Sequence, residues 1–378
     1  MNTHEMIHRL VAFETISRQS NLALIEFVQD YLHGHGVASR LVPSDDGQRA
    51  NLYASIGPPL AGGVVLSGHT DVVPVAGQPW HSDPFQVSER DGRLYGRGTS
   101  DMKSFIAIAL ALVPEMRNLK QPIHLALSYD EEVGCLGAPA IIRELVAELP
   151  APWAVIVGEP TSMQVVTAHK GVTALRTTVT GFEVHSSQPQ RGVNAVSIAS
   201  RLIQQLDTMA RQRAEAGDAE GFDPPYTTIH VGTVQGGTAL NIVPRHCEFL
   251  WDIRHVPGDD PAAIVAQLAD YCEGELIPAM QSVAPDTGIR TEMLAQVPAL
   301  AEQAGNPATE LARQLSGENA TGHVAFGAEA GQFQEAGFAT VMCGPGSIDQ
   351  AHQPDEYISL AQVARGEEFL RRLIARLS

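Results

Sequence analysis

Cysteine is scarce in this 378-residue chain, and the few cysteines are scattered. The four thiols, at Cys135, Cys247, Cys272 and Cys343, form no Cys-x-x-Cys pair. Zinc sites built from cysteine use closely spaced thiols, and disulfide-stabilised folds pair many cysteines within a short chain. The sequence therefore predicts neither a cysteine-based zinc site nor a disulfide framework.

Positive charge is also in short supply. Lysine and arginine number 25 against 43 aspartates and glutamates, which gives a formal net charge of −18. Such an excess of negative charge disfavours nucleic acid and anionic membranes as partners. No apolar run is long enough to cross a membrane, and the first residues lack the apolar segment of a signal peptide. We therefore expect a soluble, cytoplasmic protein.

The length of the chain suits two domains, and the pattern of elements changes along it. Residues 1–173 and 298–378 place short apolar strands among amphipathic helices, as in an open α/β sheet. Residues 174–297 instead read strand, helix, strand, strand, helix, strand, which is the ferredoxin-like order. The sequence predicts an α/β domain, 1–173 and 298–378, interrupted by an inserted α+β domain, 174–297.

The expected elements of the outer domain follow from apolar periodicity and from its glycine and proline boundaries. They are helices over 4–13, 21–33, 105–112, 307–315 and 359–376, and strands over 51–56, 63–67, 123–128, 153–157 and 339–342. Those of the insertion are strands over 174–181, 226–234, 245–254 and 289–296, and helices over 195–209 and 261–273.

A histidine and an aspartate stand where one short apolar strand ends. Residues 64–66 lie between glycines and predict a buried strand, and His69 and Asp71 follow it directly. Ligands bind at the carboxyl ends of strands in open α/β sheets. A neutral imidazole oriented by a carboxylate is a good ligand for a transition metal. Taken alone, the pair is a weak signal, and a purely structural role is favoured over metal binding.

Acidic residues occupy similar positions elsewhere. Asp101 precedes a predicted helix, where it could also act as an N-cap. Three consecutive acids, Asp130, Glu131 and Glu132, end another strand, and their mutual repulsion costs stability unless a cation offsets it. A solvated turn is the alternative for them. Glu159 follows a further apolar strand, again at the point where that strand stops.

These loops together predict one site at a single edge of the sheet. Two histidines and three carboxylates without cysteine suit a dinuclear hydrolytic site, in which two ions about 3.5–4 Å apart share ligands. Zinc fits such nitrogen and oxygen ligands, and cobalt or manganese could replace it. The loops carry two histidines and five acids from which such a ligand set could come, namely His69, Asp71, Asp101, Glu131, Glu132, Glu159 and His352.

On these motifs the chain resembles a known family over nearly its whole length. The residues that carry the resemblance are Ser67–Asp71, Gly96–Lys103, Asp130–Glu132, Gly158–Thr161 and the loop ending at His352. The family comprises the two-zinc amidohydrolases and peptidases, among them acetylornithine deacetylases, succinyl-diaminopimelate desuccinylases, aminoacylases and glutamate-releasing carboxypeptidases. The resemblance implies a zinc-peptidase-like three-layer catalytic domain with an inserted lid and dimerisation domain.

The resemblance also implies a ligand set for two divalent ions, with zinc expected and cobalt possible. Asp101 would bridge the two ions. His69 and Glu159 would complete the shell of one ion, and Glu132 and His352 that of the other.

The resemblance gives two further acids roles beside the ions. Asp71 would hold His69 from behind, without binding metal itself. Glu131 would be the general base that takes a proton from the attacking water and returns it to the leaving nitrogen. The resemblance further implies a cis peptide bond between Asp101 and Met102.

Motifs in the insertion match the same family. Residues 181–187 carry His185, which would reach the active site of a partner subunit and stabilise the oxyanion. A polar histidine at a strand end is the alternative from the residues alone. Residues 236–244 and 252–254 carry Asn241 and Arg254, which would bind the substrate, Arg254 as a fork for its carboxylate. A homodimer formed through the insertion is therefore expected.

Within the family, residues 21–25, 324–334 and 344–352 resemble the acetylornithine deacetylases most. Desuccinylases carry an arginine close to where this chain has Gln332, so a second substrate carboxylate is not expected. Glu329 is a candidate partner for a side-chain amine of the substrate, and an exposed helix glutamate is the alternative. The expected substrate is therefore a small acylated amino acid.

The expected reaction converts N2-acetyl-L-ornithine and water to L-ornithine and acetate, a step of arginine biosynthesis. One alternative keeps the chemistry but changes the substrate, as in a succinyl-diaminopimelate desuccinylase, a general aminoacylase or a dipeptidase. An alternative of another class is a catalytically silent relative that binds metal and ligand. The presence of Glu131 beside a complete ligand set argues against a silent relative.

Overall fold

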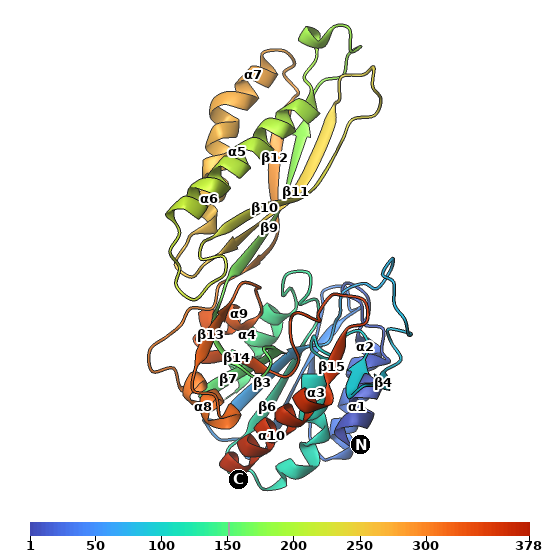
Figure 1. Ribbon diagram of the computed structural model, residues 1–378, viewed down its shortest axis with the longest axis vertical. Coiled ribbons are helices and arrows are strands. Elements are labelled where there is room, and N and C mark those ends of the chain that lie inside the picture. The colour runs from blue at the N-terminus through green and yellow to red at the C-terminus, as the bar shows by residue number, and fades with distance from the viewer. Residues whose placement is uncertain (150–151) are drawn as a thin grey trace. The chain divides into compact units, whose positions relative to one another are not determined.

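The structure is a computed structural model that describes residues 1–149 and 152–378. Its chain divides into two compact units (Figure 1). The sequence placed the divisions after residues 173 and 297, whereas the structure places them at 168/169 and 299/300. A short segment, 324–327, also returns to the second unit. The first unit comprises Met1–Ala168, Leu300–His323 and Ala328–Ser378, and the second His169–Ala299 and Val324–Gly327.

The first unit is built on an eight-stranded mixed sheet, in the order β1-β2-β6-β3-β7-β14-β8-β13. Strands β6, β3, β7 and β14 run parallel in its centre and are buried along their whole length. Because both faces of these strands are covered, their sequences are continuous apolar runs. The strands are parallel, so their carboxyl ends lie at one edge of the sheet. The strands are β1 Ser39–Pro43, β2 Ala50–Ile56, β3 Val64–His69, β6 Ile123–Ser128, β7 Ala154–Pro160, β8 Val165–His169, β13 Thr321–Val324 and β14 Thr340–Gly344.

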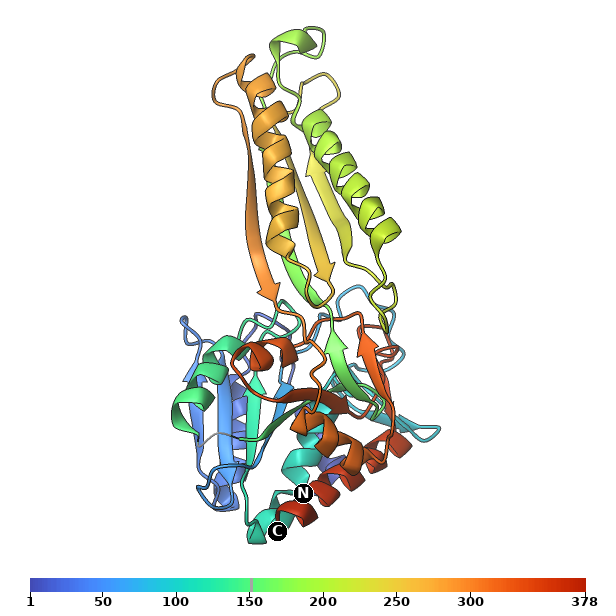
Figure 2. The same ribbon diagram turned by 90° about the vertical axis from the view of Figure 1, so that its left-hand side faces the viewer.

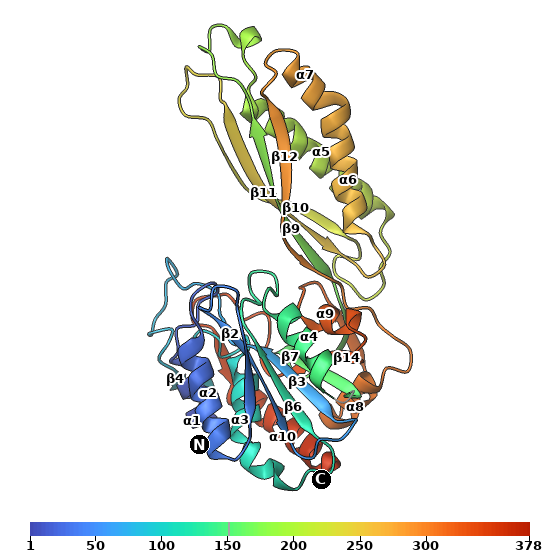
Figure 3. The same ribbon diagram turned by 180° about the vertical axis from the view of Figure 1, so that it is seen from behind.

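Helices cover both faces of this sheet, which gives three layers. Helices α1, α3 and α10 lie over one face, and α4 and α9 over the other (Figures 1 and 3). Apolar side chains of α1, α3 and α10 and of the strands beneath them form one continuous core. The helices are α1 Thr3–Val11, α2 Leu22–Gly34, α3 Lys103–Ala111, the 3-10 helix η1 Val113–Asn118, α4 Ala138–Glu148, α8 Pro307–Ser316, α9 Ala330–Glu335 and α10 Leu360–Leu377.

A second, three-stranded sheet brings two distant loops of the first unit together. Its order is β15-β5-β4, with β4 Ser88–Arg90, β5 Arg93–Tyr95 and β15 Tyr357–Ser359. Tyr357 of β15 pairs with Tyr95 of β5. The segment that leads to Asp101 therefore runs beside the segment that follows His352.

The second unit has an antiparallel four-stranded sheet, in the order β10-β11-β9-β12, with its helices on one face (Figure 2). Residues of β9 and β11 alternate between buried and half-buried, because alternate side chains pack under α5 and α6. The ferredoxin-like order is confirmed. The elements are β9 Gly171–Thr180, η2 Pro189–Arg191, α5 Ala195–Ala216, β10 Thr228–Gly236, β11 His246–His255, α6 Pro261–Tyr271, the π-helix η3 Cys272–Leu276, α7 Ile277–Gln281 and β12 Gly288–Val297.

The expected α/β class and its ferredoxin-like insertion are present, and the four cysteines are buried and free. The sequence analysis missed α4, α9 and the short strands β1, β4, β5, β8, β13 and β15. Across residues 1–149 and 152–378, no helix combines the length and the apolar character that a membrane span requires.

Candidate active site

His69 is the last residue of β3 and is 1% exposed. Its Nδ1 lies 2.9 Å from the backbone carbonyl oxygen of Asp71. A carbonyl can only accept, so Nδ1 carries a proton, and Nε2 is the nitrogen that remains for a metal ion. Nε2 lies 2.9 Å from Asp101 Oδ1 and 4.0 Å from Glu159 Oε1. The imidazole is therefore oriented with its free nitrogen toward two buried carboxylates.

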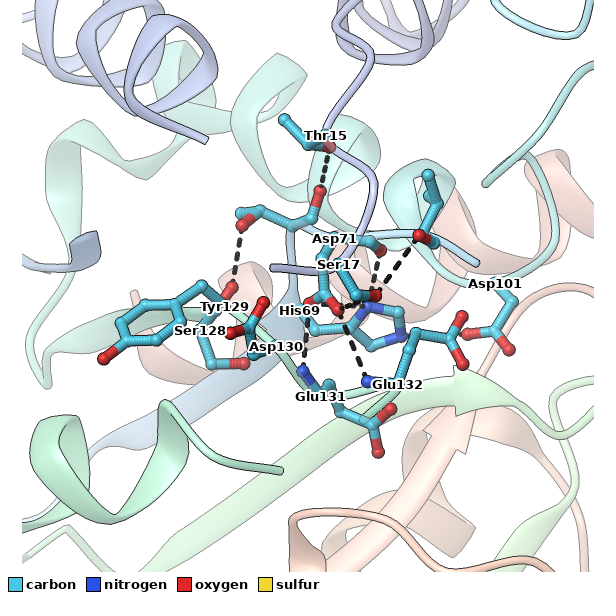
Figure 4. A network of polar contacts seen from close by, with 12 residues as sticks. Thr15, Ser17, His69, Asp71, Asp101, Ser128, Tyr129, Asp130, Glu131 and Glu132 are labelled. Atoms are coloured by element: carbon cyan, nitrogen blue, oxygen red, sulfur yellow. Dashed lines mark hydrogen bonds and ion pairs between the residues drawn. The ribbon is translucent and has the colours of Figure 1, made fainter. Parts of the chain in front are cut away.

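The carboxylate of Asp71 has a different role from the one expected for it. Its Oδ1 is 3.7 Å from His69 Nδ1, so the backbone carbonyl of Asp71, and not its side chain, holds the imidazole. The side chain accepts hydrogen bonds from Ser17 Oγ at 2.7 Å and from the backbone N–H groups of Glu131 at 3.0 Å and Glu132 at 3.4 Å (Figure 4). Asp71 thus fixes the turn that carries both glutamates.

Asp101 stands between the two histidines. Its Oδ1 faces His69 Nε2, and its Oδ2 lies 3.5 Å from His352 Nε2. His352 Nε2 is also 2.8 Å from Glu132 Oε2. One oxygen toward each imidazole is the arrangement that a carboxylate shared by two ions needs. The peptide bond that follows Asp101 is cis, as the resemblance implied.

Two overlapping groups of these residues could hold metal ions. In each group the potential ligand atoms lie within 4.8 Å of one another, His69 with Asp101 and Glu132, and His69 with Glu131 and Glu159. Among the described residues, Glu132 Oε1 and Glu159 Oε1 are buried without a hydrogen-bond partner. An unpaired buried carboxylate oxygen is costly, and a divalent cation would satisfy it. The residues present therefore fit ions that prefer nitrogen and oxygen ligands.

The electrostatics of the cluster also favour a cation. Burial, reinforced by neighbouring carboxylates, raises the pKa of Glu131 to about 8 and that of Glu132 to about 7. Hydrogen bonds that His352 donates to Asp101 and Glu132 raise the pKa of His352 to about 10. Burial would raise the pKa of Asp101, but its hydrogen bonds with His352 and His69 lower it instead. The cluster therefore retains protons at neutral pH, and a bound cation would displace them.

The three consecutive acids point to different partners. Asp130 has φ of 53°, forms an ion pair with Arg49 and accepts a hydrogen bond from the backbone N–H of Arg18 at 2.6 Å. Asp130 is thus a structural residue. Glu131 Oε1 accepts a hydrogen bond from Cys135 Sγ at 3.2 Å, and Glu132 faces His352.

Sequence reasoning missed a buried ion pair beneath Asp101. Glu356 accepts hydrogen bonds from the backbone N–H groups of Gly98 at 3.0 Å, Ser100 at 2.8 Å and Asp101 at 3.0 Å. It also accepts one from Arg97 Nη1 at 2.7 Å, and both charged side chains are 1% exposed. Arg97 and Glu356 flank expected ligands in the sequence, but nothing in their residue types indicates that they meet.

Glu329 is buried. It is 1% exposed, so its interpretation as an exposed helix residue is wrong. Oε1 accepts a hydrogen bond from Ser67 Oγ at 2.5 Å, and Oε2 accepts one from Ser128 Oγ at 2.8 Å. These serines belong to β3 and β6, the strands that carry His69 and the three acids at their ends. Burial raises the pKa of Glu329, and the nearby His69 opposes that rise.

Three candidate residues lie in the second unit. His185 is exposed, and its Nδ1 accepts from the backbone N–H of Ser187 at 3.2 Å and lies 2.8 Å from the hydroxyl of that serine. It pairs with Ile242, next to Asn241. Arg254 lies near the far end of β11, roughly 27 Å along the strand from its first residue at 3.4 Å per residue. The unit thus brings His185 and Asn241 together, but not Arg254.

Comparisons with known proteins agree on one family. Residues 65–376 match the profile of peptidase family M20/M25/M40. The acetylornithine deacetylase of Myxococcus xanthus is 38% identical, over 97% of this chain and 95% of that relative. The acetylornithine deacetylase of Pasteurella multocida is 33% identical, over 98% of this chain and 97% of that relative.

Solved structures share the fold at low sequence identity. The M20 metallo-carboxypeptidase Sso-CP2 of Sulfolobus solfataricus has a TM-score of 0.76 at 18% identity, covering 99% of this chain and 98% of that one. The dipeptidase Dug1p of Saccharomyces cerevisiae has a TM-score of 0.77 at 15% identity, covering 98% and 95%. A dinuclear metal-binding M20 peptidase of Bacillus subtilis has a TM-score of 0.61 at 15% identity, covering 99% and 98%.

Proposed function

Because the chain belongs to peptidase family M20/M25/M40, we propose that it is a metal-dependent deacetylase of N-acetyl-L-amino acids, with N2-acetyl-L-ornithine as its substrate. The proposed products are L-ornithine and acetate, and the proposed setting of the reaction is arginine biosynthesis in the cytoplasm. The observation that carries the reaction class is the buried cluster in which Asp101 faces both His69 and His352, with Glu131 beside them.

The substrate assignment rests on the relatives. Two proteins named acetylornithine deacetylase share a third or more of their residues with this chain over nearly full length. The chain also carries a neutral amide at Gln332, whose Nε2 donates to the backbone carbonyl of Cys135 at 3.3 Å. A neutral group there offers no cation for a second substrate carboxylate, which supports an acetyl over a succinyl group.

The proposed cofactor is a pair of divalent ions, zinc by the chemistry of the ligands, with cobalt able to replace it. Asp101 would bind both ions, His69 and Glu159 one, and Glu132 and His352 the other. When bound, the ions polarise the amide carbonyl and make a water molecule more acidic.

Glu131 is the proposed general base. A carboxylate oxygen of Glu131 lies within 4.8 Å of potential ligand atoms of His69 and Glu159, which places a proton acceptor beside the proposed ions. Cys135 Sγ donates to Oε1, which leaves Oε2 for the attacking water. The carboxyl group would take the proton of that water and deliver it to the leaving amine nitrogen. Asp71 holds Glu131 in place through its backbone N–H.

The proposed oligomer is a homodimer in which His185 completes the site of the partner subunit. His185 is exposed on its own unit, and the neighbouring loop carries the fully exposed apolar side chain of Leu240. Strand β10 is an edge of the four-stranded sheet and exposes Val234. Exposed apolar side chains beside an unpaired strand edge support association of two copies.

Three residues are proposed to contact the substrate. Arg254 offers a guanidinium fork for the α-carboxylate, and Asn241 an amide donor. Glu329 is proposed to favour the side-chain amine through its negative charge, since both of its oxygens already accept from serines. Glu329→Ala should therefore lower the ratio of kcat/KM for acetylornithine to kcat/KM for acetylmethionine. An unchanged preference would refute this role.

The function is tested by acetate release from a panel of acyl amino acids. The Zn²⁺-loaded protein should hydrolyse acetylornithine faster than acetylmethionine and leave succinyl-diaminopimelate intact. A chelator should abolish the activity, and added Zn²⁺ or Co²⁺ should restore it. Faster release of succinate would reassign the substrate, and no release from a metal-loaded protein would indicate a silent relative.

Glu131→Gln tests the general base. The variant should keep both ions and its fold but lose turnover by about 10²–10⁴-fold, because the neutral amide cannot accept the proton. Glu335→Gln, at the exposed end of α9, is the matched control and should remain fully active. Near-normal turnover of metal-replete Glu131→Gln would exclude the role.

Mixing two inactive variants tests the contribution of His185 across subunits. His185→Ala keeps its own Glu131, and Glu131→Gln can supply an intact His185. Heterodimers of the two should therefore regain one working site. If His185 acts within its own chain, the mixture should remain as inactive as its components.

A further inference from the structure

The two proposed ion positions differ in how firmly their histidines are held. His69 ends a central strand, is 1% exposed and has its ring fixed by a backbone carbonyl. His352 instead lies in the long loop between β14 and β15, with φ of 63° and half of its side chain exposed. A ligand in such a loop needs support from elsewhere in the structure.

Gln78 supplies a direct contact to the backbone of His352. Its Nε2 donates to the carbonyl oxygen of His352 at 2.8 Å. Its Oε1 accepts from Arg97 Nη2 at 2.6 Å and from Trp80 Nε1 at 3.0 Å. Arginine and tryptophan can only donate, so the amide oxygen must face them and the NH₂ group must face the carbonyl. The orientation of the amide is therefore determined by its partners.

Arg97 in turn is anchored to the loop that carries Asp101, the ligand proposed to be shared by both ions. It pairs with Glu356, which accepts the backbone N–H of Asp101. A continuous chain of hydrogen bonds thus runs from the backbone of Asp101 through Glu356, Arg97 and Gln78 to the backbone of His352. It joins two loops that are far apart in sequence and that both supply proposed ligands.

We propose that Gln78 is a positioning residue that sets the affinity of the ion position formed by Glu132 and His352. It acts through the backbone of His352 and touches neither ion nor substrate. The other position, formed by His69 and Glu159, is independent of it, because those side chains come from strand ends. The inference rests on the two-ion site of the proposed function.

Two substitutions separate the contacts of Gln78. Gln78→Glu keeps an oxygen for Arg97 and Trp80 but cannot donate to the carbonyl of His352. Gln78→Met removes all three hydrogen bonds at similar length. Gln86→Met, at an exposed glutamine near the same loop, is the matched control.

Zn²⁺ is titrated into each metal-free full-length protein in a calorimeter, and retained zinc is counted after gel filtration. The wild type and Gln86→Met should bind two ions. Both Gln78 variants should bind one ion as tightly as the wild type and the other about 10–100-fold more weakly, as is usual when a group supporting a ligand is lost. His352→Ala should abolish the same binding step. The thermal midpoint of the metal-free Gln78→Glu protein should stay at that of the wild type, whereas Gln78→Met leaves Arg97 Nη2 without its acceptor and should lower it.

Each other outcome is decisive. Two unchanged affinities in Gln78→Glu would overturn the proposal. Equal weakening of the binding of both ions in Gln78→Glu, or a lowered midpoint of metal-free Gln78→Glu, would also overturn it, because either result indicates general damage to the fold. A wild type that binds fewer than two ions would instead contradict the proposed function itself.

Discussion

The buried pair of Arg97 and Glu356 offers a direct test of how the loop of Asp101 is held. In the wild type, Glu356 accepts three backbone N–H groups and the guanidinium of Arg97, all at 2.7–3.0 Å. Glu356→Gln has the same shape but carries no charge. Its NH₂ group must also face one or more of the N–H donors that the carboxylate accepted.

The expected cost follows from the contacts that are lost. Leaving one member of a buried ion pair without its partner costs about 3–5 kcal/mol. Glu356→Gln should therefore lower the free energy of unfolding by about that amount. Arg97→Met removes the hydrogen bonds of the guanidinium to Glu356 and Gln78, but the carboxylate keeps three backbone donors, so its cost should lie at the lower end of that range, about 3 kcal/mol. The structure therefore predicts a larger loss in the free energy of unfolding for Glu356→Gln than for Arg97→Met.

The assay is urea denaturation in excess chelator, so that metal binding does not contribute. Circular dichroism reports the unfolding midpoint, compared at equal m-value. Glu368→Gln, which removes an exposed pair with Arg372, is the control and should lie within about 0.5 kcal/mol of the wild type. A Glu356→Gln protein as stable as this control, or less affected than Arg97→Met, would refute the reasoning.

Three more predictions concern protonation and packing. In chelated protein, the folded pKa values of Glu131 and Glu132, about 8 and about 7, lie above those of the unfolded chain, so the folded state holds protons that the unfolded state has released. The thermal midpoint should therefore fall from pH 6 to pH 8, and saturating Zn²⁺ should remove most of that slope. Burial lowers the pKa of His124 to about 4, so acidification from about pH 6.5 to 4 should cost up to about 3 kcal/mol of stability, a loss that His124→Gln should abolish in urea titrations. Gly158→Ala should lower the thermal midpoint sharply, because the new Cβ would lie 2.1 Å from the ring of Phe105, and Phe105→Leu should recover part of the loss.

The central strands could be predicted from sequence because burial on both faces leaves a continuous apolar run. The strand expected over 123–128 is observed at Ile123–Ser128, and the helix over 307–315 at Pro307–Ser316. Short elements escaped the sequence analysis. Helix α9 has six residues, and the edge strand β1 exposes polar and apolar side chains alike. Neither segment therefore shows the regular spacing of apolar residues from which a helix or strand is predicted.

The side chains of the candidate site were predictable by residue type and position, but their contacts were not. His69, Asp101, Glu132 and His352 follow strands or precede helices in the sequence, and the structure brings them together. The sequence shows that residue 71 is an aspartate, but it does not show whether its side chain or its backbone carbonyl holds His69. Gln78 and His352 are 274 positions apart, and Arg97 and Glu356 are 259 positions apart, and no local pattern encodes such pairs.

Asp71 and Glu356 solve the same physical problem at two loops of the site. A loop that presents a ligand lacks the regular hydrogen bonds of a helix or strand, so its buried N–H groups need other acceptors. Asp71 accepts those of Glu131 and Glu132, and Glu356 accepts that of Asp101 among others. A carboxylate can accept several donors at once, which makes it an efficient anchor for such a loop. The two anchors differ in charge, however, because Arg97 neutralises Glu356, whereas Asp71 adds a buried negative charge close to the ligands and so also strengthens the attraction of the site for cations.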